Sequence, residues 1–301
     1  MIKRTLCFSH PAYLSLRNKQ LSVRLEKHDG EPEREATIPV EDIGFVVLDH
    51  RQITITHGAL SALLDNNASV ITCNESHMPV GLMLPLEGNT IQSERFQSQL
   101  SASLPLRKQL WQQTVQQKIL NQAALLRELH GTGTGNMQHW AADVHSGDST
   151  NLEGRAAAFY WSQMFPTLPN FTRSREGEYP NNLLNYGYAI LRAVIARALV
   201  GSGMLPTLGI HHHSRYNAYC LADDIMEPYR PFVDRLVVET MSECCDVEVT
   251  TNIKRRLLTV PTLDVRIGGQ RSPLMVAASQ TTASLARCFA GESRRITYPE
   301  L

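Results

Sequence analysis

Three consecutive histidines at 211–213 precede a segment that carries the carboxylates Asp223, Asp224 and Glu227. If residues 221–229 are helical, Asp224 and Glu227 share a face, where two like charges repel each other. A divalent cation between them would turn this repulsion into coordination. Mixed imidazole and carboxylate ligands suit Mg²⁺ or Mn²⁺ better than a closed structural zinc site. The pattern indicates a metal-dependent catalytic site.

The same residues also have ordinary explanations. The histidines can form a solvated loop, and the acidic side chains can form an exposed helix face. A zinc hydrolase built on the histidines alone is disfavoured. Neighbouring side chains in an extended loop point in alternate directions, so three of them rarely converge on one ion.

A further carboxylate, Glu153, opens the helical string Leu152-Glu153-Gly154-Arg155-Ala156. Thr150 lies three residues before it, which fits a capping box that stabilises a helix by roughly 1 kcal/mol. A carboxylate at a helix start is equally available as a metal ligand. The local sequence leaves both interpretations open.

Amides and aromatics recur at helical spacing in residues 181–188. Asn182 and Asn185 are one turn apart, as are Asn185 and Tyr188. We expect these side chains to form hydrogen bonds with neighbouring helix ends in the core. Arg192 and Arg197 follow on the same helix and can reach either phosphates or water.

The formal net charge of zero excludes a polycation that coats nucleic acid, but a local basic groove remains compatible with it. Three basic clusters occur in the second half of the chain, at Arg173/Arg175, residues 254–256 and Arg294/Arg295. A solvated surface explains each cluster equally well. If the protein binds DNA, we expect these clusters, and Lys254, Arg255 and Arg256 in particular, to carry the affinity.

Two different sequence patterns, one in each part of the chain, predict an α+β fold. Residues 1–88 contain short β-branched runs bounded by turn residues, which predict a β-rich domain. The runs are 45–48, 53–56, 69–73 and 80–84, with one helix at 57–64 that Thr56 could cap. Residues 89–100 are interpreted as a linker.

Residues 101–301 are expected to form a mainly α-helical catalytic domain. Apolar residues recur at spacings of four and three, the mark of an amphipathic helix, at Trp111, Val115, Ile119, Ala123 and Leu126. The glycine-rich stretch 131–136 is interpreted as a linker, because no Lys-Ser/Thr follows it. Further helices are predicted at 153–165, 181–201, 219–243 and 273–290.

Composition favours a cytoplasmic enzyme. No apolar run approaches 18 residues, so a membrane span is not expected. The first residues lack the apolar core and cleavage site of a secretory signal. Six scattered cysteines are expected to be reduced, at positions 7, 73, 220, 244, 245 and 288.

Taken together, the motifs resemble the CRISPR-associated adaptation integrases, the first-numbered Cas family, in their type II-like branch. The resemblance follows the family's order over nearly the whole chain. Its main strings are Leu152 to Ala157, Asn182-x-x-Asn185-Tyr186-Gly187-Tyr188, Leu208 to His213, and Asp224 to Pro231 with Asp234. Ile38 to Ile43 and Ser284 to Arg287 also fit.

The resemblance implies a β-rich dimerisation domain and a helical domain that binds one divalent metal. Carried over by position, the metal ligands and catalytic residues are Glu153, His212 and Glu227, with Asp224 as an accessory acidic residue. The family motif needs one histidine where this chain has three. The spacing to Glu227 selects His212, with His211 and His213 as alternatives.

The implied reaction is a transesterification in which the 3′-hydroxyl of a captured DNA fragment attacks a phosphodiester at a CRISPR repeat. The implied cofactor is Mg²⁺ or Mn²⁺, and the implied partners are double-stranded DNA, a second copy of the chain and a small adaptation protein. Two alternatives stay open: a metal-dependent nuclease that only hydrolyses DNA, and a non-catalytic DNA-binding scaffold.

Overall fold

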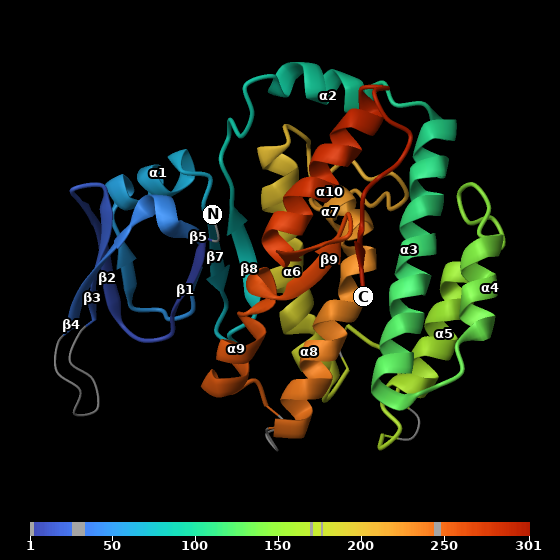
Figure 1. The fold of residues 1–301 in the computed structure, drawn as a ribbon. Coiled ribbons are helices and arrows are strands. Elements are labelled where there is room, and N and C mark those ends of the chain that lie inside the picture. The colour runs from blue at the N-terminus through green and yellow to red at the C-terminus, as the bar shows by residue number, and fades with distance from the viewer. Residues whose placement is uncertain (1–2, 26–33, 169–170, 176, 244–247) are drawn as a thin grey trace. The chain divides into compact units, whose positions relative to one another are not determined.

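Two compact units make up the chain, Met1–Gly88 and Asn89–Leu301. The computed structural model describes residues 3–25, 34–168, 171–175, 177–243 and 248–301. Strands dominate the first unit and helices the second, so the predicted α+β fold class is confirmed (Figure 1). The division between the units also coincides with the predicted end of the β-rich domain at residue 88.

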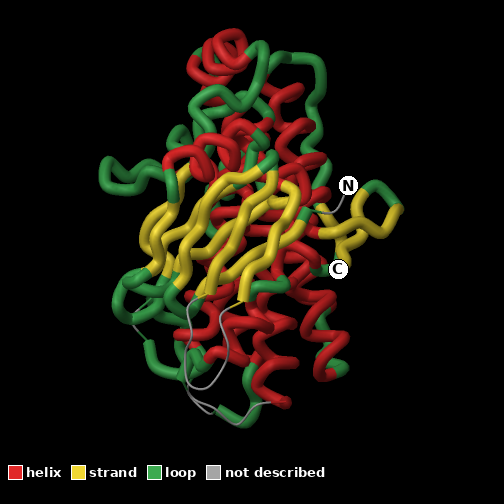
Figure 2. The backbone as a smooth tube through the Cα atoms, turned by 90° about the vertical axis from the view of Figure 1, so that its left-hand side faces the viewer, coloured by secondary structure: helices red, strands yellow, loops and turns green. Residues whose placement is uncertain are grey.

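The described part of the first unit forms two four-stranded sheets, drawn in yellow in Figure 2, with the orders β1-β5-β7-β8 and β4-β3-β2-β6. Its elements are β1 (Arg4–Phe8), β2 (Ala12–Arg17), β3 (Gln20–Leu25), β4 (Arg34–Pro39), the 3₁₀ turn η1 (Val40–Asp42), β5 (Ile43–Leu48), β6 (Ile53–Ile55), α1 (His57–Asp65), β7 (Ser69–Cys73) and β8 (Pro79–Met83).

Parallel pairing of β5 with β7 explains the helix between them. Val46 lies opposite Val70 in this pair, and parallel neighbours need a crossover connection, which β6 and α1 provide. Thr56 caps α1, because its hydroxyl accepts a hydrogen bond from the N–H of Ala59 at 3.3 Å. The four predicted strands and the predicted helix of this unit are therefore confirmed.

The second unit is mainly helical. Its elements are α2 (Gln92–Leu100), α3 (Leu104–His130), α4 (Gly135–Asp143), α5 (Leu152–Met164), α6 (Asn181–Gly201), α7 (Cys220–Met226), the 3₁₀ turn η2 (Glu227–Tyr229), α8 (Arg230–Glu243), α9 (Thr251–Leu257), the 3₁₀ turn η3 (Val260–Thr262), β9 (Asp264–Ile267), β10 (Gln270–Pro273), α10 (Leu274–Phe289) and β11 (Pro299–Glu300). The strands form a small sheet of order β10-β9-β11.

Helix α6 is the core of this unit and packs against α7, α8 and α10. It is long and apolar enough to span a membrane by composition, but 72% of its most apolar window is buried inside the unit. Gly187 allows the close approach of α8, since a Cβ there would lie 2.5 Å from Cγ1 of Val233. The burial is what a core helix requires.

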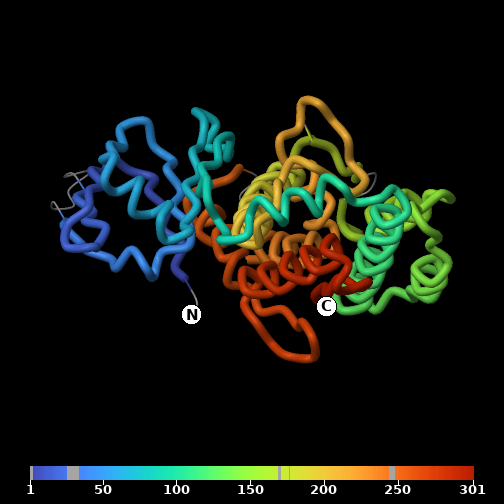
Figure 3. Tube along the Cα trace, turned by 90° about the horizontal axis from the view of Figure 1, so that it is seen from above, coloured from blue at the N-terminus to red at the C-terminus, as the bar shows by residue number. Residues whose placement is uncertain are grey.

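Helix α3 lies beside α4 and α5 (Figures 1 and 3). All five residues of its predicted apolar seam are buried, from Trp111 to Leu126. Ser103 caps its start, and Gly131 ends it in the left-handed conformation with φ of 61°. The predicted amphipathic helix is confirmed. Polar side chains of α3 also contribute to the site described below.

Three expectations need correction. The predicted linker 89–100 contains α2, which belongs to the second unit and packs against α10. The predicted linker 131–136 runs into α4, which begins at Gly135. The helix predicted over 219–243 is interrupted by η2, because Pro228 lacks the N–H that a continuous helix needs.

The expectation of reduced cysteines agrees with the described residues. Cys220 and Cys288 are free thiols. Cys244 and Cys245 lie outside the described residues.

Candidate active site

Asp224 organises the histidine loop. Its side chain is fully buried, and Oδ2 accepts hydrogen bonds from the N–H groups of Ile210 at 2.7 Å and His211 at 3.0 Å. Oδ1 accepts the N–H of His212 at 3.1 Å and lies 2.5 Å from its ring Nδ1. The hydrogen bond to Asp224 raises the pKa of His212. With Nδ1 engaged, Nε2 is the ring nitrogen left for a ligand.

Gly209 is the residue that lets this loop fold over Asp224. A Cβ at this position would lie 2.3 Å from the carbonyl oxygen of His212 and 2.8 Å from Oδ2 of Asp224. Any larger residue must therefore push the loop away from the carboxylate. The glycine is required by close backbone approach, which the sequence pattern alone did not reveal.

The three histidines have three different environments. His211 stacks on Trp111 of α3, with ring centroids 4.1 Å apart and an interplanar angle of 3°. Burial lowers the pKa of His211. His212 faces Asp224, and His213 is exposed. The rings of His211 and His212 nevertheless contact each other edge to face, with centroids 5.3 Å apart, so the loop does not turn all three side chains away from one another.

Of the two interpretations of Glu153, the structure contradicts the capping box with Thr150. Asn151 is the N-cap of α5 and accepts a hydrogen bond from the N–H of Gly154 at 3.2 Å. Asp148 accepts the N–H groups of Leu152 and Glu153 at 2.9 and 3.0 Å. The first turn is thus already capped by other side chains. The carboxylate of Glu153 pairs instead with Lys118, whose Nζ lies 2.6 Å from Oε1.

Glu227 sits at the junction between α7 and α8 with both carboxylate oxygens engaged by cations. Nε of Arg230 donates to Oε1 at 2.9 Å, and Nζ of Lys118 lies 2.6 Å from Oε2. The side chain is only 7% exposed. Burial alone would raise the pKa of Glu227, but Arg230 and Lys118 outweigh it and lower the pKa to about 2.

Lys118 of α3 therefore joins Glu153 and Glu227, two of the residues selected from the sequence. Its side chain is 11% exposed, so the ammonium is held inside the unit between two carboxylates. The sequence analysis missed this residue. Its position could have indicated it: Lys118 lies next to the buried residue Ile119 and one turn after Val115. A charged side chain so close to a buried helix face needs a buried partner of opposite charge.

A second layer of polar groups surrounds Arg230. The guanidinium carbons of Arg230 and Arg173 lie 4.4 and 5.1 Å from the ring centroid of Tyr188. Tyr188 and Tyr160 donate hydrogen bonds to Asp234, at 2.5 and 2.7 Å. Burial raises the pKa of Asp234 to about 6, against the opposing effect of these hydroxyls. This layer fixes Arg230, and through it Glu227.

Asn185 has a positioning role, but its partners lie in the non-helical segment 171–175 and not at a neighbouring helix end, as had been expected. Asn185 accepts a hydrogen bond from Arg173 at 2.7 Å and donates one to the carbonyl oxygen of Arg175 at 2.8 Å. Arg192 pairs with Asp223 at 2.6 Å, which accounts for the third carboxylate of the original pattern. Asn185 thus holds the segment that delivers Arg173 to the site.

Two pockets flank these residues. One of about 390 Å³ opens beside His212 and includes Arg107 and Arg215 in its lining. The other, of about 180 Å³, is lined by Lys118, Gln122, Ala157, Trp161, Arg173, Tyr188, Glu227, Arg230 and Asp234. Both pockets combine positive charge with aromatic or imidazole groups, which suits a phosphate-bearing substrate.

The cluster at 254–256 does not match the expected role in DNA binding. Lys254 is 6% exposed, and Arg256 pairs with Glu239 and Glu243 at 3.6 and 2.8 Å. Lys254 and Arg256 are therefore engaged within the protein, whereas Arg255 is exposed.

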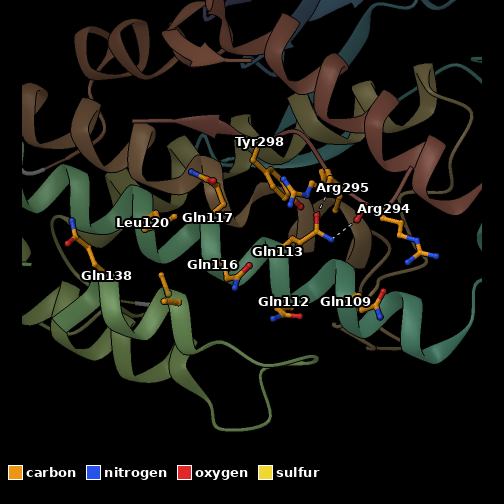
Figure 4. Close-up of a pocket in the computed structure, with 13 residues that line it drawn as sticks. Gln109, Gln112, Gln113, Gln116, Gln117, Leu120, Gln138, Arg294, Arg295 and Tyr298 are labelled. Carbon is orange, nitrogen blue, oxygen red and sulfur yellow. Dashed lines mark hydrogen bonds between the residues drawn. The ribbon is translucent and has the colours of Figure 1, made fainter. Parts of the chain in front are cut away.

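Arg294 and Arg295 border a groove of about 780 Å³ along α3 (Figure 4). Its remaining lining is polar or apolar and contains no carboxylate among the described residues: Gln109, Gln112, Gln113, Gln116, Gln117, Leu120, Gln138, Ala141, Ala142, Ile296 and Tyr298. Figure 4 shows Gln113 of α3 hydrogen-bonded to the segment that carries the two arginines, at the carbonyl oxygen of Arg294 and the N–H of Ile296.

The lowered pKa of Glu227 predicts acid sensitivity of the metal-free protein. Because the pKa falls from 4.5 to about 2 on folding, the contribution of Glu227 to stability is complete above pH 4.5 and disappears as the pH falls toward 2. Between pH 6 and pH 3, wild type should lose about 2 kcal/mol more unfolding free energy than Glu227→Gln. Urea denaturation in EDTA measures this difference. Equal losses in the two proteins would contradict it.

Comparisons with known proteins identify the family. Residues 6–244 match the model of the family described as CRISPR associated protein Cas1. The chain is 36% identical to the CRISPR-associated endonuclease Cas1 of Neisseria meningitidis serogroup C (strain 8013), over all of this chain and 97% of that protein.

Solved structures agree in fold. A casposase bound to integration product superimposes with a TM-score of 0.79 at 18% identity, covering 98% of this chain and 92% of that one. A Cas6-RT-Cas1–Cas2 complex gives a TM-score of 0.74 at 21% identity, over 99% of this chain and 36% of that one. On the strength of the family match and the full-length relative, this chain belongs to the Cas1 family of CRISPR-associated endonucleases.

Proposed function

We propose that this protein inserts captured double-stranded DNA fragments at CRISPR repeats by metal-dependent transesterification. The observation that carries the proposal is the convergence of Glu153 and Glu227 on one cationic atom, Nζ of Lys118, at 2.6 Å each. His212, oriented by Asp224, belongs to the same region. Likeness to a casposase bound to integration product and family membership support the joining reaction.

The donor chemistry of the site fits Mg²⁺ or Mn²⁺. Among the described residues, no group of three or more His, Cys, Asp or Glu side chains is already spaced to hold a metal. The ammonium of Lys118 nevertheless occupies a cation position between two of the proposed ligands. We therefore propose Glu153, Glu227 and Nε2 of His212 as the ligands, since carboxylates and neutral imidazole suit these ions.

Asp224, expected as an accessory ligand, is assigned a different role here. Its two oxygens already accept from three backbone N–H groups and face Nδ1 of His212. A carboxylate so placed fixes the orientation of an imidazole ligand and raises its basicity. We propose that Asp224 is a positioning residue.

When bound, the metal would polarise the phosphodiester and stabilise charge that develops in the transition state. The protein's own groups hold the reactants. Arg230 and its partner Tyr188 fix Glu227, and Arg173 presents a guanidinium to the adjoining pocket. A guanidinium matches phosphate geometry and keeps its charge at neutral pH.

Products decide between this function and its alternatives. Labelled duplex with free 3′-hydroxyl ends, incubated with repeat DNA and Mg²⁺ or Mn²⁺, should yield branched joined DNA. Free ends alone would indicate a nuclease that only hydrolyses. Binding that is equal in metal and EDTA, without turnover, would indicate a DNA-binding scaffold.

The groove at Arg294 and Arg295 is proposed as part of the DNA path. Its two guanidinium groups and the absence of carboxylates in its described lining favour a polyanion. Reversing both charges, Arg294→Glu with Arg295→Glu, should reduce the slope of log Kd against log salt by about 2, one per lost phosphate contact. Arg255→Glu with Arg256→Glu is the matched control and should leave the slope nearly unchanged. Equal slopes for wild type and the groove variant would remove this surface from the DNA path.

We also propose a homodimer formed through the β-rich unit and assembly with a small adaptation partner in the cytoplasm. The Cas6-RT-Cas1–Cas2 complex, which shares this fold, supports a second protein component. Analytical ultracentrifugation at tens of micromolar should show a dimer, because this concentration is well above the dissociation constant of a typical specific interface. A monomer at that concentration would contradict the dimer.

A further inference from the structure

Lys118 and a divalent metal compete for the same carboxylates, because both are cations that would lie between Glu153 and Glu227. Oε1 of Glu227 is taken by Arg230 and Oε2 by Lys118, which also binds Oε1 of Glu153. A metal that bridges Glu153 and Glu227 is repelled by both of these cations, which favours displacement of one of them from Glu227. The group that competes with the metal is the ammonium of Lys118, whose Nζ lies 2.6 Å from an oxygen of each carboxylate.

Lys118 is the cation that can leave. Arg230 is three residues from Glu227 and is packed over the ring of Tyr188 at 4.4 Å. Its planar fork is further fixed by that stacking. Lys118 reaches the carboxylates from α3 through a flexible four-carbon stem, and its ammonium is a point charge with rotatable donors. Movement of Lys118 therefore breaks fewer contacts than movement of Arg230.

A receiving position for the ammonium lies one helical turn away. Gln122 follows Lys118 by four residues on α3 and is 4% exposed. Its buried Oε1 accepts no hydrogen bond from the part of the chain that the structure describes. Both residues line the 180 Å³ pocket, so an ammonium that leaves the carboxylates can turn toward Oε1 of Gln122.

That position still lacks a negative charge. The pocket contains one further carboxylate, Asp234, whose oxygens already accept the hydroxyls of Tyr160 and Tyr188. Arg173 and Arg230 add positive charge on the same wall. A buried ammonium without a counter-charge is strongly unfavourable. An anionic group of the substrate, a DNA phosphate, supplies the missing charge.

We propose that Lys118 is a metal-displaced phosphate ligand: it holds Glu153 and Glu227 together until the metal enters, then turns to Gln122 and binds a DNA phosphate in the adjoining pocket. This inference rests on the proposed metal site. It makes metal binding and DNA binding reciprocal, since each ligand favours the same position of Lys118.

Calorimetric titration of the DNA-free protein with Mn²⁺ tests the displacement. Lys118→Met should bind Mn²⁺ at least about tenfold more tightly than wild type, because a competing positive charge has been removed. Lys108→Met, an exposed lysine on the same helix, is the matched control and should bind as wild type. Lys118→Gln serves as a second variant if the methionine variant unfolds. Unchanged or weaker Mn²⁺ binding by folded Lys118 variants would overturn the inference.

Failure of the metal site itself gives a different result. If Glu153 is not a ligand, Glu153→Gln should bind Mn²⁺ as wild type, and the proposed function falls with it. If Glu153→Gln loses binding while the Lys118 variants match wild type, the metal site stands and only the displacement fails.

The phosphate contact is tested by the salt dependence of DNA binding. At saturating Mn²⁺, Lys118→Met should show a slope of log Kd against log salt smaller by roughly 0.7–0.9, the loss of one phosphate contact. In EDTA, where Lys118 is held by the carboxylates, the slopes of variant and wild type should coincide. Equal slopes in Mn²⁺ would refute the phosphate contact.

Discussion

Glu153→Gln is expected to reduce strand joining by roughly 100-fold or more, while the protein stays folded and still binds DNA. The change removes a charged oxygen donor at nearly constant volume. It leaves the start of α5 intact, because Asn151 and Asp148, rather than Glu153, accept the hydrogen bonds of the first turn. The measurement is single-turnover strand transfer in Mg²⁺ and Mn²⁺, with circular dichroism and DNA binding alongside.

The control for this variant is Glu128→Gln. Glu128 lies on α3 in a half-exposed ion pair with Arg235 at 3.5 Å, and such pairs stabilise proteins by about 0–1 kcal/mol. It should join DNA as wild type does. Strand transfer by Glu153→Gln at a rate near that of wild type would sink the assignment of Glu153 as a metal ligand.

Asp224→Asn is expected to weaken metal binding by about 10- to 100-fold, the usual effect of losing a group that orients a ligand. It should also destabilise the fold by about 1–3 kcal/mol, since buried N–H groups of the histidine loop lose a charged acceptor. Calorimetry with Mn²⁺ and urea denaturation measure the two effects.

The pH dependence separates a positioning role from a ligand role. Asp224 raises the pKa of His212, so protons compete with the metal for His212 up to a higher pH in wild type. Without that carboxylate the pKa falls, and the pH of half-maximal metal binding should move downward in Asp224→Asn even though the plateau affinity is lower. His213→Asn, at an exposed neighbour, should leave the midpoint unchanged. A midpoint in Asp224→Asn equal to that of wild type would favour direct ligation by Asp224.

Local sequence patterns predicted many of the helices and strands correctly. The seam from Trp111 to Leu126 predicted α3 because a helix that buries one face must repeat apolar residues at that spacing. Thr56 and the β-branched runs predicted α1 and its flanking strands for similarly local reasons. Strands β10 and β11 were not predicted, because their local strand signals are weak and they form by pairing with β9.

The sequence by itself supplied the candidate residues Glu153, His212, Asp224 and Glu227: the spacing of carboxylates and histidines indicated a metal site, and the resemblance to the family selected Glu153 and His212. Only the tertiary structure decided what each one touches. Asp224 turned to the histidine loop because buried backbone N–H groups require an acceptor, and Glu153 was free of capping because Asn151 supplied it. Lys118, 35 residues from Glu153 along the chain, joined the site through the packing of α3 against α5 and η2, a contact that no local pattern encodes.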